Sequence, residues 1–131
     1  MAPANSGYIL VVDDAAFMRR MIAGIVRTLG YDVLDAPDGA NAIKTMKQDP
    51  PRLVVLDLLM PQMSGYEVCE WIRSNPATAH IPVIICTADQ ERKHLALAIK
   101  AGASDILCKP VTKASLQERL NKHLQSTGAS S

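Results

Sequence analysis

A short apolar run near the middle of this chain ends in a single carboxylate. Leu53–Leu56 are all apolar, Asp57 follows directly, and Pro61, Ser64 and Gly65 come soon after. Such a run is too short for a helix and is typical of a strand buried on both faces of a parallel sheet. Because burial of an unpaired charge is costly, we expect Asp57 at the open end of that strand. Taken alone, Asp57 is as compatible with an ordinary turn as with a functional site.

The bulk composition indicates one globular domain. The chain has 131 residues, of which 48% are hydrophobic and 21% are charged, and its net charge is +1. This charge gives no argument for contact with nucleic acid or an anionic membrane, and no apolar run approaches the roughly 20 residues that span a bilayer. Met1–Gly7 lack the apolar core of a secretion signal, so we expect a cytoplasmic protein.

The cysteines and histidines show no metal-ligand spacing. The cysteines are odd in number and widely separated, at Cys69, Cys86 and Cys108. We interpret them as reduced thiols of the core. The histidines are equally scattered and are interpreted as surface or partly buried residues, at His80, His94 and His123.

Strand and helix patterns alternate along the chain. Five strands are predicted, at Tyr8–Val12, Tyr31–Ala36, Leu53–Leu56, Ile81–Cys86 and Ser104–Cys108. A helix follows each strand, and three of the helices begin after residues able to cap them, namely Asp38, Ser64 and Thr112. This order predicts an α/β fold, a single (βα)5 doubly wound parallel sheet. The first, third and fourth strands are the most apolar and should be central, which fits the flavodoxin-like strand order 2-1-3-4-5.

Helical spacing predicts which helix faces are buried. The first helix ends at Gly30 and has one apolar stripe, formed by Phe17, Met21, Ile25 and Leu29 with Met18, Ile22 and Val26 beside them. The fourth helix is expected from Asp89 or Gln90 to Gly102. Its predicted inward residues are Leu95, Ala98 and Ile99.

Polar residues follow the ends of four of the predicted strands. They are Asp13 and Asp14, then Asp57, Thr87 and Lys109. The carboxyl ends of parallel strands meet at one rim, so these side chains should converge. Each residue alone has an ordinary explanation as a helix cap, a turn residue or a solvated charge. The coincidence across strands is the specific signal.

The converging groups suit phosphoryl chemistry. Three crowded carboxylates repel one another, and a hard divalent cation such as Mg2+ removes that repulsion while it also holds phosphate oxygens. Asp57 can then act as a carboxylate nucleophile that forms an aspartyl phosphate. Thr87 can donate a hydrogen bond to the phosphoryl oxygens, and Lys109 can pair with another of them.

The motifs together resemble one known family. The residues that carry the resemblance are V-V-D-D at Val11–Asp14, L-D-L-L-M-P-Q-M-S-G at Leu56–Gly65, C-T-A at Cys86–Ala88, G-A-S-D at Gly102–Asp105 and K-P at Lys109–Pro110. The chain resembles, over about Tyr8 to Leu124, the CheY-like receiver domain of two-component response regulators. This resemblance implies a stand-alone receiver domain at 8–125 between flexible segments at 1–7 and 126–131.

The resemblance also implies the metal ligands. Asp57 would be the phosphoacceptor. Mg2+ would be bound by Asp14, Asp57 and the backbone carbonyl of Leu59, with Asp13 assisting through water.

The resemblance further implies how the phosphoryl group is handled. Thr87 would be the switch hydroxyl and Lys109 would contact the phosphoryl group, with a cis bond between Lys109 and Pro110. The donor would be a phosphohistidine on a sensor histidine kinase or phosphotransfer protein, and Mg2+-assisted hydrolysis would remove the acyl phosphate. Such a chain is a switch rather than an enzyme, apart from its own phosphorylation and dephosphorylation.

Several positions depart from the family pattern. Ile106 stands where Tyr or Phe is frequent, and Val111 stands where Phe is frequent. Isoleucine cannot reproduce the inward swing of an aromatic ring. Switching is therefore expected to rest on Thr87 and loop movement, or on a smaller rearrangement of the fourth helix.

The residue two positions after Asp57 is Leu59, beside the expected path of the hydrolytic water. We hypothesise slow self-dephosphorylation, because an apolar side chain there cannot orient water. Asp89 is the expected counterweight, either holding water or pairing with Lys109.

By the same resemblance, a kinase would dock near the first helix, around Ala15, Met18 and Met21. Output partners would read the fourth helix, fifth strand and fifth helix, and a phosphorylation-dependent dimer is compatible with that face, which includes Arg92, Lys93, Lys100 and Ile106. An ordinary solvated face explains the same positive charges equally well.

Two alternatives remain beside the switch. A phosphatase of the haloacid dehalogenase type expects a second Asp two residues after the nucleophile, where Leu59 stands. A pseudo-receiver that binds partners without phosphorylation is disfavoured by the intact Asp57, Thr87 and Lys109, and Ile106 keeps it open. A dinucleotide or flavin protein would need a glycine-rich loop after the first strand, which is missing.

Overall fold

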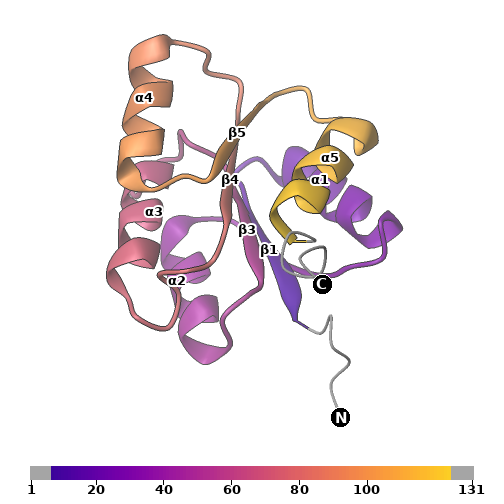
Figure 1. Ribbon diagram of the computed structural model, residues 1–131, viewed down its shortest axis with the longest axis horizontal. Helices are drawn as coiled ribbons and strands as arrows, with labels where there is room; N and C mark the ends of the chain where they lie inside the picture. Colours follow the sequence, from indigo (N-terminus) through magenta and orange to yellow (C-terminus); the bar gives the residue numbers. More distant parts are fainter. Residues whose placement is uncertain (1–6, 125–131) are drawn as a thin grey trace.

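The structure, a computed structural model, describes residues 7–124 as a five-stranded parallel sheet between two layers of helices (Figure 1). The strands are β1 (Tyr8–Val12), β2 (Asp32–Ala36), β3 (Leu53–Leu56), β4 (Val83–Thr87) and β5 (Asp105–Cys108). Their order is β2-β1-β3-β4-β5, which confirms the predicted fold and its three central strands. The segments predicted to be flexible, 1–7 and 126–131, lie outside the described residues except for Gly7.

Helices cover both faces of the sheet. They are α1 (Ala16–Thr28), α2 (Gly39–Gln48), α3 (Gly65–Ser74), α4 (Arg92–Ala101) and α5 (Lys113–Leu124). α1 and α5 lie on one face, and α2, α3 and α4 lie on the other (Figure 1). Alternate strand residues supply the two apolar cores, so Ile9 packs with the α1–α5 layer and Leu10 with the opposite layer. Among the described residues, no helix is long and apolar enough to cross a membrane.

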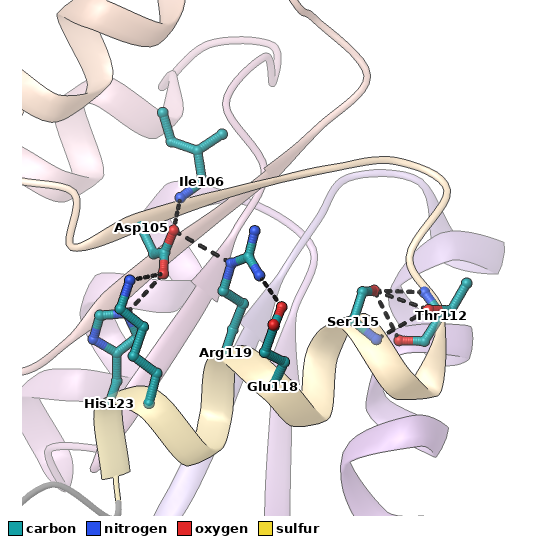
Figure 2. Close-up of polar contacts among 8 residues, drawn as sticks. Asp105, Ile106, Thr112, Ser115, Glu118, Arg119 and His123 are labelled. Carbon is teal, nitrogen blue, oxygen red and sulfur yellow. Dashed lines mark hydrogen bonds and ion pairs between the residues drawn. The ribbon is translucent and has the colours of Figure 1, made fainter.

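Side-chain caps begin three of the helices, as the residue types predict. Asp38 accepts a hydrogen bond from the N–H three residues later, at 2.8 Å. Ser64 and Glu67 form a reciprocal capping box at the start of α3. At the start of α5, the Thr112 hydroxyl accepts the N–H of Ser115 at 3.0 Å (Figure 2).

The burial predicted for α1 is partly wrong. Phe17 is 79% exposed, and the buried residues of the helix are Ile22, Ala23 and Val26. Each residue advances about 100° around a helix, so positions four apart drift by about 40° at every step. Phe17 therefore faces solvent although Leu29, in the same row, is partly buried.

The prediction for α4 is also partly wrong. The helix begins at Arg92 rather than at Asp89 or Gln90. Ala98 is its buried residue, whereas Ile99 is 52% exposed. Adjacent helical residues point about 100° apart, so one packed residue does not bury its neighbour.

Two strand predictions need small corrections that concern the site. β4 extends to Thr87, which is therefore the last residue of the strand, and β5 begins at Asp105 rather than at Ser104. Cys69 and Cys86 are buried, but Cys108 is exposed. The interpretation of Cys108 as a core thiol is wrong, because β5 is an edge strand whose side chains are only partly covered.

The largely buried carboxylate of Asp105 connects β5 to α5 through hydrogen bonds and ion pairs (Figure 2). Asp105 accepts the N–H of Ile106 at 2.9 Å, and it contacts His123 Nε2 at 2.9 Å and Arg119 Nε at 3.3 Å. Burial pushes the pKa of Asp105 upward, but the hydrogen bonds from His123 and Ile106 and the charges of Arg119 and Lys122 hold that pKa below its usual value. The ionised carboxylate is thus the favoured form, and it ties the edge strand to the last helix.

The turn between β3 and α3 depends on a glycine. The Gly65 N–H donates to the Leu58 carbonyl at 2.8 Å. A Cβ at this position would lie 2.3 Å from the Asp57 carbonyl oxygen and 2.8 Å from the Leu58 Cα. Only glycine lets the start of α3 approach the end of β3 this closely, and that approach sets the position of Asp57.

We expect Gly65→Ala to lower the free energy of unfolding by about 1–3 kcal/mol, because the methyl group overlaps main-chain atoms at the end of β3. Gly24→Ala is the matched control. Its Cβ would meet no atom within 4 Å, and alanine favours a helix interior over glycine by about 1 kcal/mol. Urea denaturation followed by circular dichroism measures both. Equal stability of Gly65→Ala and the native protein would contradict the close approach.

Candidate functional site

The predicted acidic residues meet at the carboxyl edge of the sheet. The Asp57 N–H donates to the carbonyl of Val12, the last residue of β1, at 2.9 Å, so the ladder between β1 and β3 continues to the site. Each of Asp13, Asp14 and Asp57 offers a carboxylate oxygen within 4.8 Å of the others. The convergence predicted from the strand ends is therefore present in the structure.

Lys109 is the cation of the site. Its main-chain N–H donates to the Thr87 carbonyl at 2.9 Å. The peptide bond between Lys109 and Pro110 is cis, as predicted. Lys109 Nζ lies 2.9 Å from Asp13 Oδ2 and 3.7 Å from Asp57 Oδ1. Burial alone would lower the pKa of Lys109, but the hydrogen bond to Asp13 and the charges of Asp57 and Asp13 raise it above its ordinary value. Lys109 is thus positively charged at neutral pH.

The Asp13 carboxylate already has two partners. Asp13 is 1% exposed, its Oδ1 accepts the Ala15 N–H at 2.9 Å, and its Oδ2 accepts from Lys109 at 2.9 Å. Asp14, by contrast, is exposed. Asp14 and Asp57 are therefore better placed than Asp13 to bind a cation directly.

Asp57 combines burial with crowding by like charges. Burial raises its pKa from 3.8 to about 6, Lys109 opposes the rise, and the charges of Asp13 and Asp14 add to it. A bound divalent cation would reverse this balance, since it favours the ionised form. A divalent cation at this site would therefore stabilise the ionised form of Asp57.

Thr87 ends β4 and is buried at 1% exposure. Its hydroxyl accepts the Asp89 N–H at 3.1 Å, while Asp89 pairs with His94 of α4 and accepts the Glu91 N–H at 2.9 Å. The bond from the Glu91 N–H and the pairing with His94 hold the pKa of Asp89 below its usual value. Of the two roles expected for Asp89, pairing with Lys109 is wrong, because donors at the start of α4 engage its carboxylate instead. The other role, holding water, stays a prediction.

The two side chains that follow Asp57 differ in burial. Leu58 is fully buried, whereas Leu59 is 54% exposed. Leu59 therefore adds apolar surface two residues after Asp57.

One residue of the site was not predicted from the sequence. Arg19 Nη1 donates to the carbonyl of Asp13 at 2.9 Å, and Arg19 Nε pairs with Asp35 Oδ2 at 2.9 Å. In the sequence, Arg19 is only a basic residue beside the apolar stripe of its helix. Its partners are the residue just after β1 and a residue of β2, so no local spacing could have indicated the contact.

The family follows from a comparison with known proteins. The response regulator receiver domain family matches residues 9–121. The chain belongs to this family. It is a receiver domain of the CheY-like, two-component type, as the strand-end motifs predicted.

Two curated relatives illustrate the sequence similarity. The chemotaxis protein CheY-3 of Vibrio cholerae is 36% identical over 115 residues, covering 87% of this chain and 88% of that protein. The probable transcriptional regulator ycf27 of Porphyridium aerugineum is 37% identical over 117 residues, covering 89% of this chain. The match spans only 48% of the ycf27 protein, about half its length.

A solved structure gives the likeness in three dimensions. The receiver domain of a sensor histidine kinase from Pseudomonas aeruginosa, which has a magnesium ion coordinated in its active site cleft, superimposes with a TM-score of 0.86 and 28% identity. The likeness covers 92% of this chain and 99% of that one.

The donor set of this chain fits a hard divalent cation. Its three carboxylates lie within 4.8 Å of one another, and Lys109 is the only lysine or arginine among residues 7–124 whose side chain pairs with any of them. Mg2+ takes oxygen ligands and commonly one or two carboxylates. Asp14 and Asp57 are the residues that would hold it.

In buffer without divalent cations, we expect Asp57→Asn to be more stable than the native protein at about pH 7.5, by about 1–3 kcal/mol, and equal to it near about pH 4. The folded-state pKa of Asp57 is raised to about 6. The proton bound to Asp57 therefore stabilises the folded form fully at pH values below the pKa of Asp57 in the unfolded chain. This stabilisation is lost as the pH rises through about 6, the pKa of Asp57 in the folded chain.

Urea unfolding at a series of pH values measures this difference. Asp32→Asn is the matched control, because Asp32 is exposed and lies at the start of β2, away from the carboxyl edge. A stability gain that does not change with pH, or that is the same in both variants, would contradict the raised pKa.

Proposed function

We propose that this chain is a phosphorylation-activated switch of a two-component phosphorelay. Asp57 accepts a phosphoryl group from a phosphohistidine of a sensor histidine kinase or phosphotransfer protein, and the phosphorylated form changes its partner binding. The observation that carries the proposal is the Asp57 carboxylate within 4.8 Å of two further carboxylates, with Lys109 Nζ at 3.7 Å. Phosphoryl transfer depends mainly on such positioning and charge neutralisation.

In the transfer step, an Asp57 oxygen attacks phosphorus while the P–N bond to the donor imidazole breaks and its electron pair returns to nitrogen. Lys109 balances charge on a phosphoryl oxygen while Asp13 holds its ammonium group in place. Mg2+ bound by Asp14, Asp57 and the Leu59 carbonyl, with Asp13 acting through water, would supply further charge neutralisation. The product is an acyl phosphate, so the chain is itself modified and is not an enzyme beyond its own phosphorylation and hydrolysis.

Thr87 is the proposed link between the phosphoryl group and α4. Its hydroxyl accepts from the Asp89 N–H, so its proton remains available for a phosphoryl oxygen. Asp89 is paired with His94 in the first turn of α4. Movement of Thr87 toward Asp57 would therefore act on the residues that hold the start of α4, without an aromatic ring at position 106.

The proposed partner surfaces follow the arrangement of the helices. The phosphodonor would dock beside α1, around Ala15, Met18 and Met21, where the exposed Phe17 adds apolar area. Output partners, or a second phosphorylated copy, would contact the α4–β5–α5 face, which carries Arg92, Lys93, Lys100 and Ile106. A net charge of +1 gives no reason to expect nucleic acid or membrane as a partner, and a cytoplasmic location fits a kinase donor.

Incubation with Mg2+ and acetyl phosphate tests the acceptor. We expect intact mass spectrometry to show one added phosphoryl group in the native protein and none in Asp57→Asn, since the amide is not a nucleophile. EDTA should abolish the addition. A phosphoryl group that persists in Asp57→Asn, or none in the native protein, would overturn the proposal and favour a pseudo-receiver that binds partners without phosphorylation.

Leu59→Asn tests the lifetime of the signal. We expect the variant to lose its phosphoryl group about tenfold faster, because an amide can orient the hydrolytic water that an apolar side chain excludes. Leu59→Met is the matched control and should keep the native lifetime. Loss of phosphoryl group is followed by mass spectrometry after removal of the donor. A native half-life shorter than that of Leu59→Asn would contradict the role of Leu59.

A further inference from the structure

We infer that Arg19 is a positioning residue of this site, which orients the acidic pair through the main chain of Asp13. The inference rests on the proposed Mg2+-dependent phosphorylation and names a residue that no strand-end motif contains.

The guanidinium group of Arg19 joins three elements. Its Nη1 donates to the Asp13 carbonyl at 2.9 Å, and its Nε pairs with Asp35 Oδ2 at 2.9 Å. The side chain is only 15% exposed. Arg19 thus connects the first turn of α1 to the residue after β1 and to a residue of β2.

This contact completes the hydrogen bonding of Asp13. The Asp13 N–H donates to the Ala36 carbonyl at 3.2 Å, and its carboxylate accepts from Ala15 and Lys109. The carbonyl of this buried residue has Arg19 as its donor. Loss of that donor would leave a buried carbonyl unpaired, which is costly enough to turn the peptide toward another partner.

The orientation of that carbonyl matters to Asp14. The Asp13 carbonyl belongs to the peptide plane that leads into Asp14, and the Ala15 N–H of the next peptide plane donates to Asp13 Oδ1 at 2.9 Å. With both planes held, the direction in which the Asp14 side chain leaves the backbone is restricted. Within residues 7–124, the Asp14 side chain has no hydrogen bond of its own to hold it. Its approach to Asp57 therefore depends on the main chain that Arg19 holds.

The charge of Arg19 does not explain a supporting role. A positive charge near three carboxylates would oppose the binding of a cation, and this charge is paired with Asp35 at 2.9 Å. Removal of the charge alone would therefore strengthen Mg2+ binding. Removal of the positioning contact would weaken it, so the two roles predict changes of opposite sign.

The experiment compares Mg2+ affinity, by isothermal titration calorimetry, in the native protein and in Arg19→Ala, Arg19→Lys and Arg20→Ala. We expect Arg19→Ala to bind Mg2+ about tenfold more weakly, as is typical when a residue that orients a ligand is lost. Arg19→Lys should also be weaker, because a single ammonium group cannot bridge the carbonyl and Asp35 as the planar fork does. Arg20→Ala is the matched control, with the same loss of charge at an exposed neighbour, and should bind like the native protein.

A second readout separates positioning from a general loss of structure. Phosphorylation by acetyl phosphate should require about tenfold more Mg2+ for half-maximal rate in Arg19→Ala, with a maximal rate close to the native one. Unfolding curves confirm that each variant is folded at the assay temperature. If Arg19→Ala does not fold, the same comparison is made with Arg19→Lys.

The outcomes distinguish this inference from the proposed function. Failure of the native protein to bind Mg2+ overturns both. Native-like or tighter binding by folded Arg19→Ala or Arg19→Lys overturns the positioning role alone. Equal weakening in Arg20→Ala shows that the loss does not depend on the contacts of Arg19, and it also overturns the positioning role.

Discussion

Three carboxylates and one ammonium group share a small volume at the carboxyl edge of the sheet. Lys109 lies 2.9 Å from Asp13 and 3.7 Å from Asp57, but its single positive charge does not balance three negative ones. Burial raises the pKa of Asp57 to about 6; Lys109 opposes this rise, and the charges of Asp13 and Asp14 add to it. A divalent cation would relieve the repulsion among these carboxylates, and under the proposed function the site would then accept a negatively charged phosphoryl group. The proposed chemistry thus starts from a crowding of negative charge that the folded chain holds in place.

Ordinary packing elsewhere maintains this unfavourable arrangement. The central strands are buried on both faces, with Leu10, Val54 and Ile84 at 0% exposure. Their ends cannot spread apart to separate the carboxylates. At the edge itself, Gly65 lets α3 pack against the main chain of Asp57, and Arg19 fixes the carbonyl of Asp13. Local conflict at a functional edge, offset by a consistent core, is common in proteins that must bind a charged ligand.

Much of the fold could be predicted because hydrophobic periodicity is a local property. The apolar strands at the centre, the mixed strands at the edges and the caps at Asp38 and Ser64 are all present in the structure. The errors concern residues whose burial depends on what a neighbouring element covers. Phe17 and Ile99 satisfy a helical spacing yet face solvent, and Cys108 is exposed because it lies on an edge strand.

The site, like the fold, was predicted where the pattern is local and missed where contacts depend on tertiary packing. The residue pattern was sufficient to place Asp13, Asp14, Asp57 and Lys109 together, because parallel strands must end at a common rim. Side-chain partners were decided only by the packed structure, in which Asp89 pairs with His94 instead of Lys109. The physical reason is the separation along the chain. Hydrophobic periodicity involves residues that are close in the sequence, whereas a hydrogen bond between distant residues forms only when tertiary packing brings its two groups within about 3 Å. The contacts of Arg19, with Asp35 of β2 and with Asp13 just after β1, form in that way.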